Sequence, residues 1–119
     1  MTPETLAMIQ GWYFLLTGVW PIFSINTFMA VTGPKTDLWL VKTVGAVLAV
    51  TGAVLLTAGG THEVTPAVAH LAAGSAAALA AVDVIYASKR VISRIYLADA
   101  AAEVALIIGW AVFYLPKTT

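Results

Sequence analysis

The stretch SRIYLADAAAEVALIIGW (residues 93–110) is apolar enough from Ile95 onward to lie in a lipid bilayer, yet it carries two acidic residues. Asp99 and Glu103 are four positions apart, which places them one turn apart on the same face of a helix. A hydrocarbon core of roughly 30 Å is crossed by a helix of about 20 mostly apolar residues. The stretch therefore predicts a membrane span that holds two carboxyl groups away from bulk water.

The composition of the whole chain supports a lipid environment. Of its 119 residues, 61% are hydrophobic and only 10% are charged, and the mean hydropathy is +0.92. Soluble domains usually carry about 25% charged residues, so we expect the lipid bilayer to be the first partner of this chain. Six basic residues balance six acidic ones, which argues against nucleic acid as a partner. The lack of cysteine excludes disulfides, thiolate catalysis and zinc–thiolate sites.

Four segments are long and apolar enough to be membrane spans. We expect them at residues 5–31, 38–58, 66–88 and 93–115. The breaks between them carry helix-stop and helix-start signals, namely Gly33-Pro34, Thr65 followed by Pro66, and Ser93. All three loops are short, so consecutive helices are expected to be antiparallel neighbours. The sequence predicts an all-α integral membrane protein: one domain, residues 1–119, with four antiparallel transmembrane helices.

The distribution of basic residues predicts the orientation in the membrane. The first and third loops hold Lys35, Lys89, Arg90 and Arg94, whereas the opposite side holds only Lys117. Lysine and arginine are concentrated in cytoplasmic loops of membrane proteins. We therefore expect a multi-pass protein of the cell membrane with both its N- and C-termini extracytoplasmic.

With this topology, every predicted span carries a polar group in its cytoplasmic half. At 1.5 Å per residue the groups lie roughly 6 to 15 Å below the cytoplasmic boundary, and they are Asn26, Lys42, Asp83, Asp99 and Glu103. A charge at the bilayer centre costs at least about 2.5 kcal/mol, so mutual pairing inside the bundle is the expected arrangement. We predict that Lys42 contacts a carboxylate. These five residues are our candidates for binding a ligand or an ion.

The acids outnumber the one lysine in this layer. If Lys42 neutralises one carboxylate, like charges in a poor dielectric resist the ionisation of the others, and at least one acid keeps its proton. Glu103 is the deepest of the acids and has no basic residue at its own depth, so we expect it to be protonated. A purely structural interpretation stays open, in which the polar layer only holds the helices together.

Three further residues are secondary candidates. Tyr86 and Tyr96 are typical of the aromatic belt at a membrane interface. His70 lies inside the third predicted span, and we expect it to be a hydrogen-bonded packing residue. His62 and His70 are eight positions apart on one loop and helix, which does not suit the facing axial ligands of a haem between helices. We predict no metal site and no cofactor.

Small residues and one proline indicate how the helices pack. Gly45, Ala49 and Gly52 share a face of the second predicted span, and small faces let helix backbones approach closely. Packing within the bundle is favoured over a homodimer or a larger membrane complex, although both alternatives stay open. Trp20-Pro21 lies within the first span, where proline frees a backbone carbonyl and should kink the helix.

The chain also contains a weak internal repeat. A shift of 57 residues aligns residues 38–54 with residues 95–111 and places Lys42 on Asp99 and Gly52 on Gly109. If the repeat is real, the two helix hairpins are parallel repeats related by an axis along the membrane normal.

The segment WLVKTVGAVLAVTGAVLL (residues 39–56) resembles the second helix of the small four-helix DoxX-like membrane proteins. The resemblance is carried by Trp39, Lys42, Gly45 and the pair Gly52-Ala53, and by His70 near the start of the next span. It implies a four-helix membrane fold and a link to redox homeostasis. The acids of the fourth span are not part of this family pattern.

Three functions are compatible with the sequence. The first is a small membrane protein that binds or transports a cation, a proton or a small amphiphile at Asp99 and Glu103, with Lys42 as counter-ion. The second is a non-enzymatic partner or assembly subunit, DoxX-like and associated with redox proteins, whose polar layer is structural. The third, an intramembrane enzyme acting on a lipid or a quinone, is less favoured because no histidine lies on the cytoplasmic side of the predicted spans.

Overall fold

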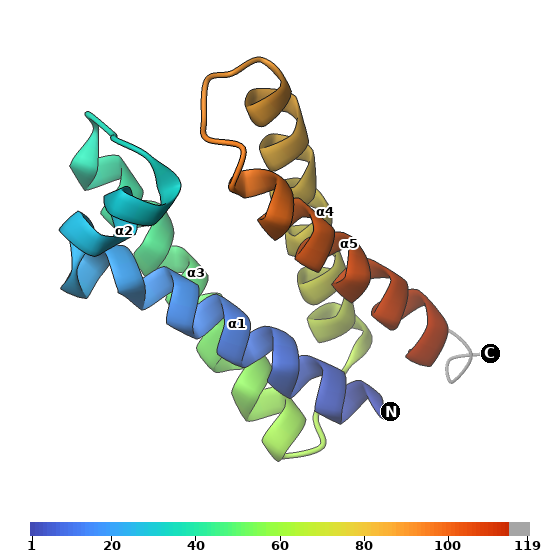
Figure 1. Cartoon of the computed structure of the whole chain (residues 1–119). Coiled ribbons are helices and arrows are strands. Elements are labelled where there is room, and N and C mark those ends of the chain that lie inside the picture. Colours follow the sequence, from blue (N-terminus) through green and yellow to red (C-terminus); the bar gives the residue numbers. More distant parts are fainter. Residues whose placement is uncertain (115–119) are drawn as a thin grey trace.

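The computed structural model of the chain describes residues 1–114 and is entirely helical. Its helices are α1 (Pro3–Phe23), α2 (Ile25–Thr32), α3 (Leu38–Gly60), α4 (Pro66–Ser88) and α5 (Tyr96–Phe113) (Figure 1). Within the described residues, four of them, α1, α3, α4 and α5, are long and apolar enough to cross a membrane. The all-α class is therefore confirmed, and the four helices support the predicted multi-pass membrane character. Residue 115, the predicted end of the fourth span, and Lys117 lie outside the described part.

Two of the membrane-spanning helices begin with the same local signal. The Thr2 hydroxyl accepts a hydrogen bond from the Thr5 N–H at 3.1 Å, and Pro3 follows it at the first helical position. Thr65 accepts in the same way from the Val68 N–H at 3.3 Å, and Pro66 opens α4 as predicted. The start of α5 differs from the prediction, because this helix begins at Tyr96 rather than at Ser93. The hydroxyl of Ser93 instead accepts from the Ile95 N–H within the preceding turn.

The first predicted span, residues 5–31, is two helices rather than one. Pro21 lies inside α1, and the chain leaves helical geometry three residues later, at Ser24, with φ −150° and ψ 79°. Proline removes a backbone donor and crowds the preceding turn, which weakens the helix at this point. The Trp20 Nε1–H donates to the Thr27 hydroxyl at 3.0 Å and fixes the corner between α1 and α2. The expected kink at Pro21 is thus replaced by a break at Ser24.

Helices α1 and α3 pack with their backbones in direct contact. The contact, here called the glycine seam, is formed by Gly11, Gly18, Gly45, Gly52 and Gly59. A Cβ atom added to Gly18 would lie 2.4 Å from the carbonyl oxygen of Gly45, and one added to Gly52 would lie 2.5 Å from the backbone nitrogen of Leu15. No side chain fits in that space. The predicted use of Gly45 and Gly52, close packing inside the chain, is confirmed.

Helices α4 and α5 form the second pair, and α1 packs against this pair as well. The shared core consists mainly of apolar side chains from α1, α4 and α5, with Leu55 contributed by α3, and its members are Leu6, Ala7, Phe14, Leu55, Ala69, Ala72, Ala76, Leu106 and Trp110. Alanines on α4 keep that helix thin enough for α1 and α5 to approach it. Figure 1 shows the two pairs close together near the N-terminus and separated at the end where the α2–α3 and α4–α5 connections lie.

Candidate functional site

The three acids of the predicted polar layer come together in the structure. Asp83 lies near the end of α4, Asp99 lies in the first turn of α5, and Glu103 follows one turn later. The short connection between α4 and α5 folds these segments against each other, so that Asp83 and Glu103 are both within electrostatic range of Asp99. Asp83 is 4% exposed and Glu103 is 0% exposed. We call these three residues the carboxyl cluster.

A tyrosine from α1 completes the cluster. The Tyr13 hydroxyl donates a hydrogen bond to Oδ1 of Asp99, and Tyr13 is within electrostatic range of Asp83 and Glu103 as well. Tyr13 lies on the part of α1 that packs against α5, and its side chain is half-buried. Asp99 is therefore the acid with a donor supplied by a neighbouring helix.

Glu103 and one oxygen of Asp83 lack such a donor. Within residues 1–114, both carboxyl oxygens of Glu103 and Oδ2 of Asp83 are buried without a hydrogen-bond partner. A buried polar group without a partner costs about 1–3 kcal/mol, and an ionised one costs more. The cheapest way to reduce this cost is for an oxygen to carry a proton, or to meet a cation that enters the cluster.

A second polar contact ties three helices together. The fully buried Gln10 of α1 donates from Nε2 to the carbonyl oxygen of Ala72 on α4 at 2.8 Å. Its Oε1 accepts from the indole N–H of Trp110 on α5 at 2.7 Å. Every polar atom that this contact buries on Gln10 and Trp110 has a partner, so it can hold the helices together without binding anything else.

Sequence reasoning did not identify Gln10 and Tyr13. The expected polar layer lies in the cytoplasmic half of each predicted span, and in the first span that half contains Asn26. The signal was nevertheless present, because Gln10 and Tyr13 are three positions apart in an apolar segment and share a helix face. The structure places Asn26 instead on α2, where it is exposed and away from the carboxyl cluster.

The predicted pairing of Lys42 with a carboxylate is wrong. Lys42 is exposed on α3, and in the part of the chain that the structure describes no carboxylate lies within ion-pair distance of it; the ion pair found there joins His62 and Glu4 at 3.7 Å. The reason is the glycine seam, which turns α3 toward α1 rather than toward α5. Helix α1 ends at Phe23, just beyond its contact with Gly45, and leaves the next turn of α3 uncovered.

The secondary candidates lie at the edges of the molecule. Tyr86 is exposed on α4, and Tyr96 is half-buried at the start of α5, with the Lys35 ammonium 5.1 Å from its ring centroid. His70 is exposed, and its side chain forms no hydrogen bond with any described residue. The expected hydrogen-bonded packing role of His70 is therefore wrong. None of the three joins the carboxyl cluster.

The geometry of the cluster limits what it can bind. Among the described residues, no three His, Cys, Asp or Glu side chains converge closely enough to hold a metal ion. The pocket between the loops and the pocket beside Val50 and Val68 both lie elsewhere, and neither is lined by an acid of the cluster. A proton needs no cavity, whereas an amphiphile does.

Comparison with known proteins gives no assignment: no family model, no curated protein and no solved structure matches the chain.

Proposed function

We propose that the chain is a small membrane carrier whose carboxyl cluster binds and releases a proton during transport. The observation that carries the proposal is the state of Glu103, which is fully buried with both carboxyl oxygens unpartnered in the described structure. A residue kept only for packing would be cheaper as an apolar side chain, because a buried acid without partners opposes folding. Ionisable residues inside membrane spans commonly mark proton relays or substrate paths.

The three acids would have different roles in binding and releasing the proton. Asp99 accepts a hydrogen bond from Tyr13, which holds its carboxyl group in one orientation. Asp83 and Glu103 keep unpartnered oxygens and can take up the proton. No lysine or arginine pairs with any of the three within residues 1–114, so a proton or a small cation is the available neutralising group.

The proposal includes an orientation and a helix arrangement. We propose four antiparallel spans, α1, α3, α4 and α5, with both termini extracytoplasmic, because the connections before α3 and before α5 hold Lys35, Lys89, Arg90 and Arg94. The hairpins α1–α3 and α4–α5 are proposed to be parallel repeats. In support, Gly52 and Gly109, which the 57-residue shift aligns, both lie against α1.

Infrared difference spectroscopy of the purified protein tests proton binding directly. Raising the pH should remove the C=O stretch of a protonated carboxylic acid, and Glu103→Gln should abolish most of this band. The matched control is Glu63→Gln, which makes the same chemical change in an exposed loop and should leave the band intact. Equal bands in the wild-type protein and in Glu103→Gln would refute proton binding at Glu103.

Transport itself is tested in proteoliposomes that contain a pH-sensitive dye. With candidate substrates outside, the wild-type protein should couple substrate entry to proton movement. Asp99→Asn should lower the initial rate at least ten-fold, while Asp37→Asn, the same change in the α2–α3 connection, should have little effect. If both variants behave like the wild-type protein, the cluster takes no part in transport.

A partner or assembly subunit, DoxX-like and associated with redox proteins, is the second candidate. Lys42 favours it, because this lysine is exposed on a membrane-spanning helix and pairs with no described carboxylate. An acid on another membrane protein could neutralise it. The two candidates predict opposite results: in a partner subunit, Lys42→Gln disrupts a membrane complex while substitutions in the carboxyl cluster leave proton binding and transport unchanged.

A further inference from the structure

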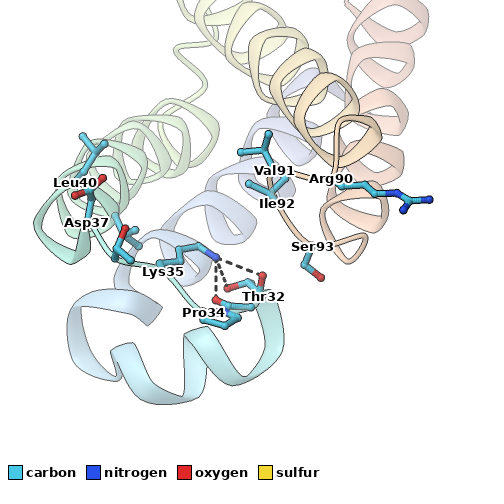
Figure 2. A pocket seen from close by; sticks show the side chains of 12 residues that line it. Thr32, Pro34, Lys35, Asp37, Leu40, Arg90, Val91, Ile92 and Ser93 are labelled. Carbon is cyan, nitrogen blue, oxygen red and sulfur yellow. Dashed lines mark hydrogen bonds between the residues drawn. The ribbon is translucent and has the colours of Figure 1, made fainter.

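A pocket of about 780 Å3 opens between the two connections that carry most of the basic residues. One wall is the α2–α3 connection with Lys35 and Asp37, and the other is the α4–α5 connection with Arg90 and Ser93 (Figure 2). Because the pocket lies at the ends of the membrane-spanning helices, it is level with the headgroups of a surrounding bilayer. It is separate from the carboxyl cluster, none of whose acids line it.

Lys35 places a fixed positive charge in this pocket. Its ammonium donates to the carbonyl oxygens of Thr32 and Gly33 at 3.3 and 3.2 Å and to the Thr32 hydroxyl at 3.2 Å. It also lies 5.6 Å from the ring centroid of Phe28 and 5.1 Å from that of Tyr96. All these partners are neutral, so they hold the ammonium in place without cancelling its charge.

Arg90 adds a second positive charge at the rim. Its backbone has a φ of 60°, and its exposed guanidinium extends away from the Lys35 side of the pocket in Figure 2. Asp37 is the acid among the lining residues, and it forms no ion pair with Lys35 or Arg90 within residues 1–114. The lining therefore carries two cations and one anion, and neither cation is neutralised by a carboxylate.

The rest of the lining combines hydroxyl groups with apolar side chains. Thr36 donates no side-chain hydrogen bond to a described residue, and the Ser93 hydroxyl acts only as the acceptor for the Ile95 N–H. Both can donate to an oxyanion. Leu40 and Val91 also line the pocket and remain 46% and 68% exposed. Apolar walls beside unpaired cations suit an amphiphile with an anionic head better than a free inorganic ion.

From this arrangement we propose that the pocket between the two connections binds the phosphate of one anionic phospholipid. The exposed guanidinium of Arg90 turns from its outward position to meet the phosphate at the rim, Lys35 supplies fixed positive charge from the wall, and the hydroxyls of Thr36 and Ser93 donate to the phosphate oxygens. Leu40 and Val91 contact the glycerol and the first part of an acyl chain. The bound lipid bridges the α1–α3 pair and the α4–α5 pair at the end where they are separated.

Native mass spectrometry of the full chain in a neutral detergent tests this proposal by counting retained lipids. Phosphatidylglycerol should bind at a ratio of one and saturate, whereas phosphatidylcholine should be at least ten-fold weaker. Arg90→Gln should weaken phosphatidylglycerol about five-fold, because a basic residue near anionic lipid contributes about 1 kcal/mol. The matched control is Lys89→Gln, which removes the same charge from the adjacent exposed residue outside the pocket and should change affinity less than two-fold.

A second variant tests the same pocket independently, in case Arg90→Gln does not fold. Thr36→Glu places a negative charge on an exposed lining residue and should weaken phosphatidylglycerol more than five-fold, while Thr61→Glu at the other end of α3 should not. The proposal is overturned if phosphatidylcholine binds equally well, or if Lys89→Gln is as damaging as Arg90→Gln. It is also overturned if soluble glycerol phosphate displaces the lipid at equal concentration, because the site would then recognise free phosphate. None of these readouts depends on the carboxyl cluster.

Discussion

Helix α1 packs in two opposite ways, one against α3 and the other against the pair formed by α4 and α5. Against α3 it presents Gly11 and Gly18, and the two backbones touch with no side chain between them. Against α4 and α5 it presents Gln10 and Tyr13, whose long polar side chains reach across to both helices. The contact with α3 requires that no side-chain atoms lie between the two backbones. The contact with α4 and α5 requires side chains that donate and accept specific hydrogen bonds. The two sides of α1 should therefore respond differently to substitution.

The glycine seam should show the largest effect. Gly18→Ala adds a Cβ that would lie 2.4 Å from the Gly45 oxygen and 2.6 Å from the Ala49 nitrogen, both of which are backbone atoms that cannot move independently. We expect a loss of about 3 kcal/mol in the free energy of unfolding, at the upper end of the range for overpacked cores. Denaturant titration in mixed micelles measures this loss.

Gly74→Ala is the control, since nothing lies within 4 Å of a Cβ at that position of α4. It should be neutral or slightly stabilising. Equal stability of Gly18→Ala and Gly74→Ala would mean that α1 and α3 are not in backbone contact.

Loss of the buried hydrogen bond between Gln10 and Trp110 should have a smaller effect on stability. The cost of substituting Gln10 should depend on whether Trp110 is present. Gln10→Leu leaves the buried Trp110 N–H without its acceptor, and we expect a loss of about 2 kcal/mol. In Trp110→Phe the donor is absent, so adding Gln10→Leu should cost less than it does alone. A double-mutant cycle should give a coupling energy of about 1 kcal/mol, in the range found between helices in membranes. Strict additivity would show that the two side chains do not interact.

The same contrast explains which features could be predicted from the sequence. Spans of about 20 apolar residues and short loops follow from composition and length alone, and the packing of Gly45 and Gly52 follows from their small size. The clustering of Asp83, Asp99 and Glu103 was predicted from their common depth. In each case a local property of the chain determined the result.

The predictions that were wrong concern features that depend on which helix faces which. Its similar depth in the membrane predicts that Lys42 pairs with the acids, but depth does not determine the direction in which a helix face points. The glycine seam sets that direction for α3, and Lys42 is exposed as a result. The break at Ser24 was missed because proline fixes only where a helix weakens, while the corner depends on Trp20 and Thr27.

Tyr13→Phe should be milder than Gln10→Leu, because it removes one donor from a half-buried acid that can be partly solvated. We expect a loss of about 1 kcal/mol in the free energy of unfolding. The informative control is the double variant Tyr13→Phe with Asp99→Leu, in which the acid no longer needs a donor. If Tyr13→Phe costs the same in both backgrounds, the hydroxyl does not serve Asp99.

The smallest effect on stability is expected at the most deeply buried acid. Glu103 has both carboxyl oxygens buried and unpartnered, and no cation pairs with it among residues 1–114. Beside Asp83 and Asp99 it is most easily accommodated as the neutral acid, since like charges in a poor dielectric oppose one another. Gln has nearly the shape of a neutral Glu and can also donate a hydrogen bond. Glu103→Gln should therefore change the free energy of unfolding by less than about 0.5 kcal/mol, the range usual for substitutions that remove no specific interaction.

A loss above about 2 kcal/mol would place a charge on Glu103, because removing one partner of a buried ion pair is strongly destabilising. Thermal unfolding of Glu103→Gln beside the exposed control Glu63→Gln distinguishes the two states, and a charged Glu103 would require a cation partner from outside residues 1–114.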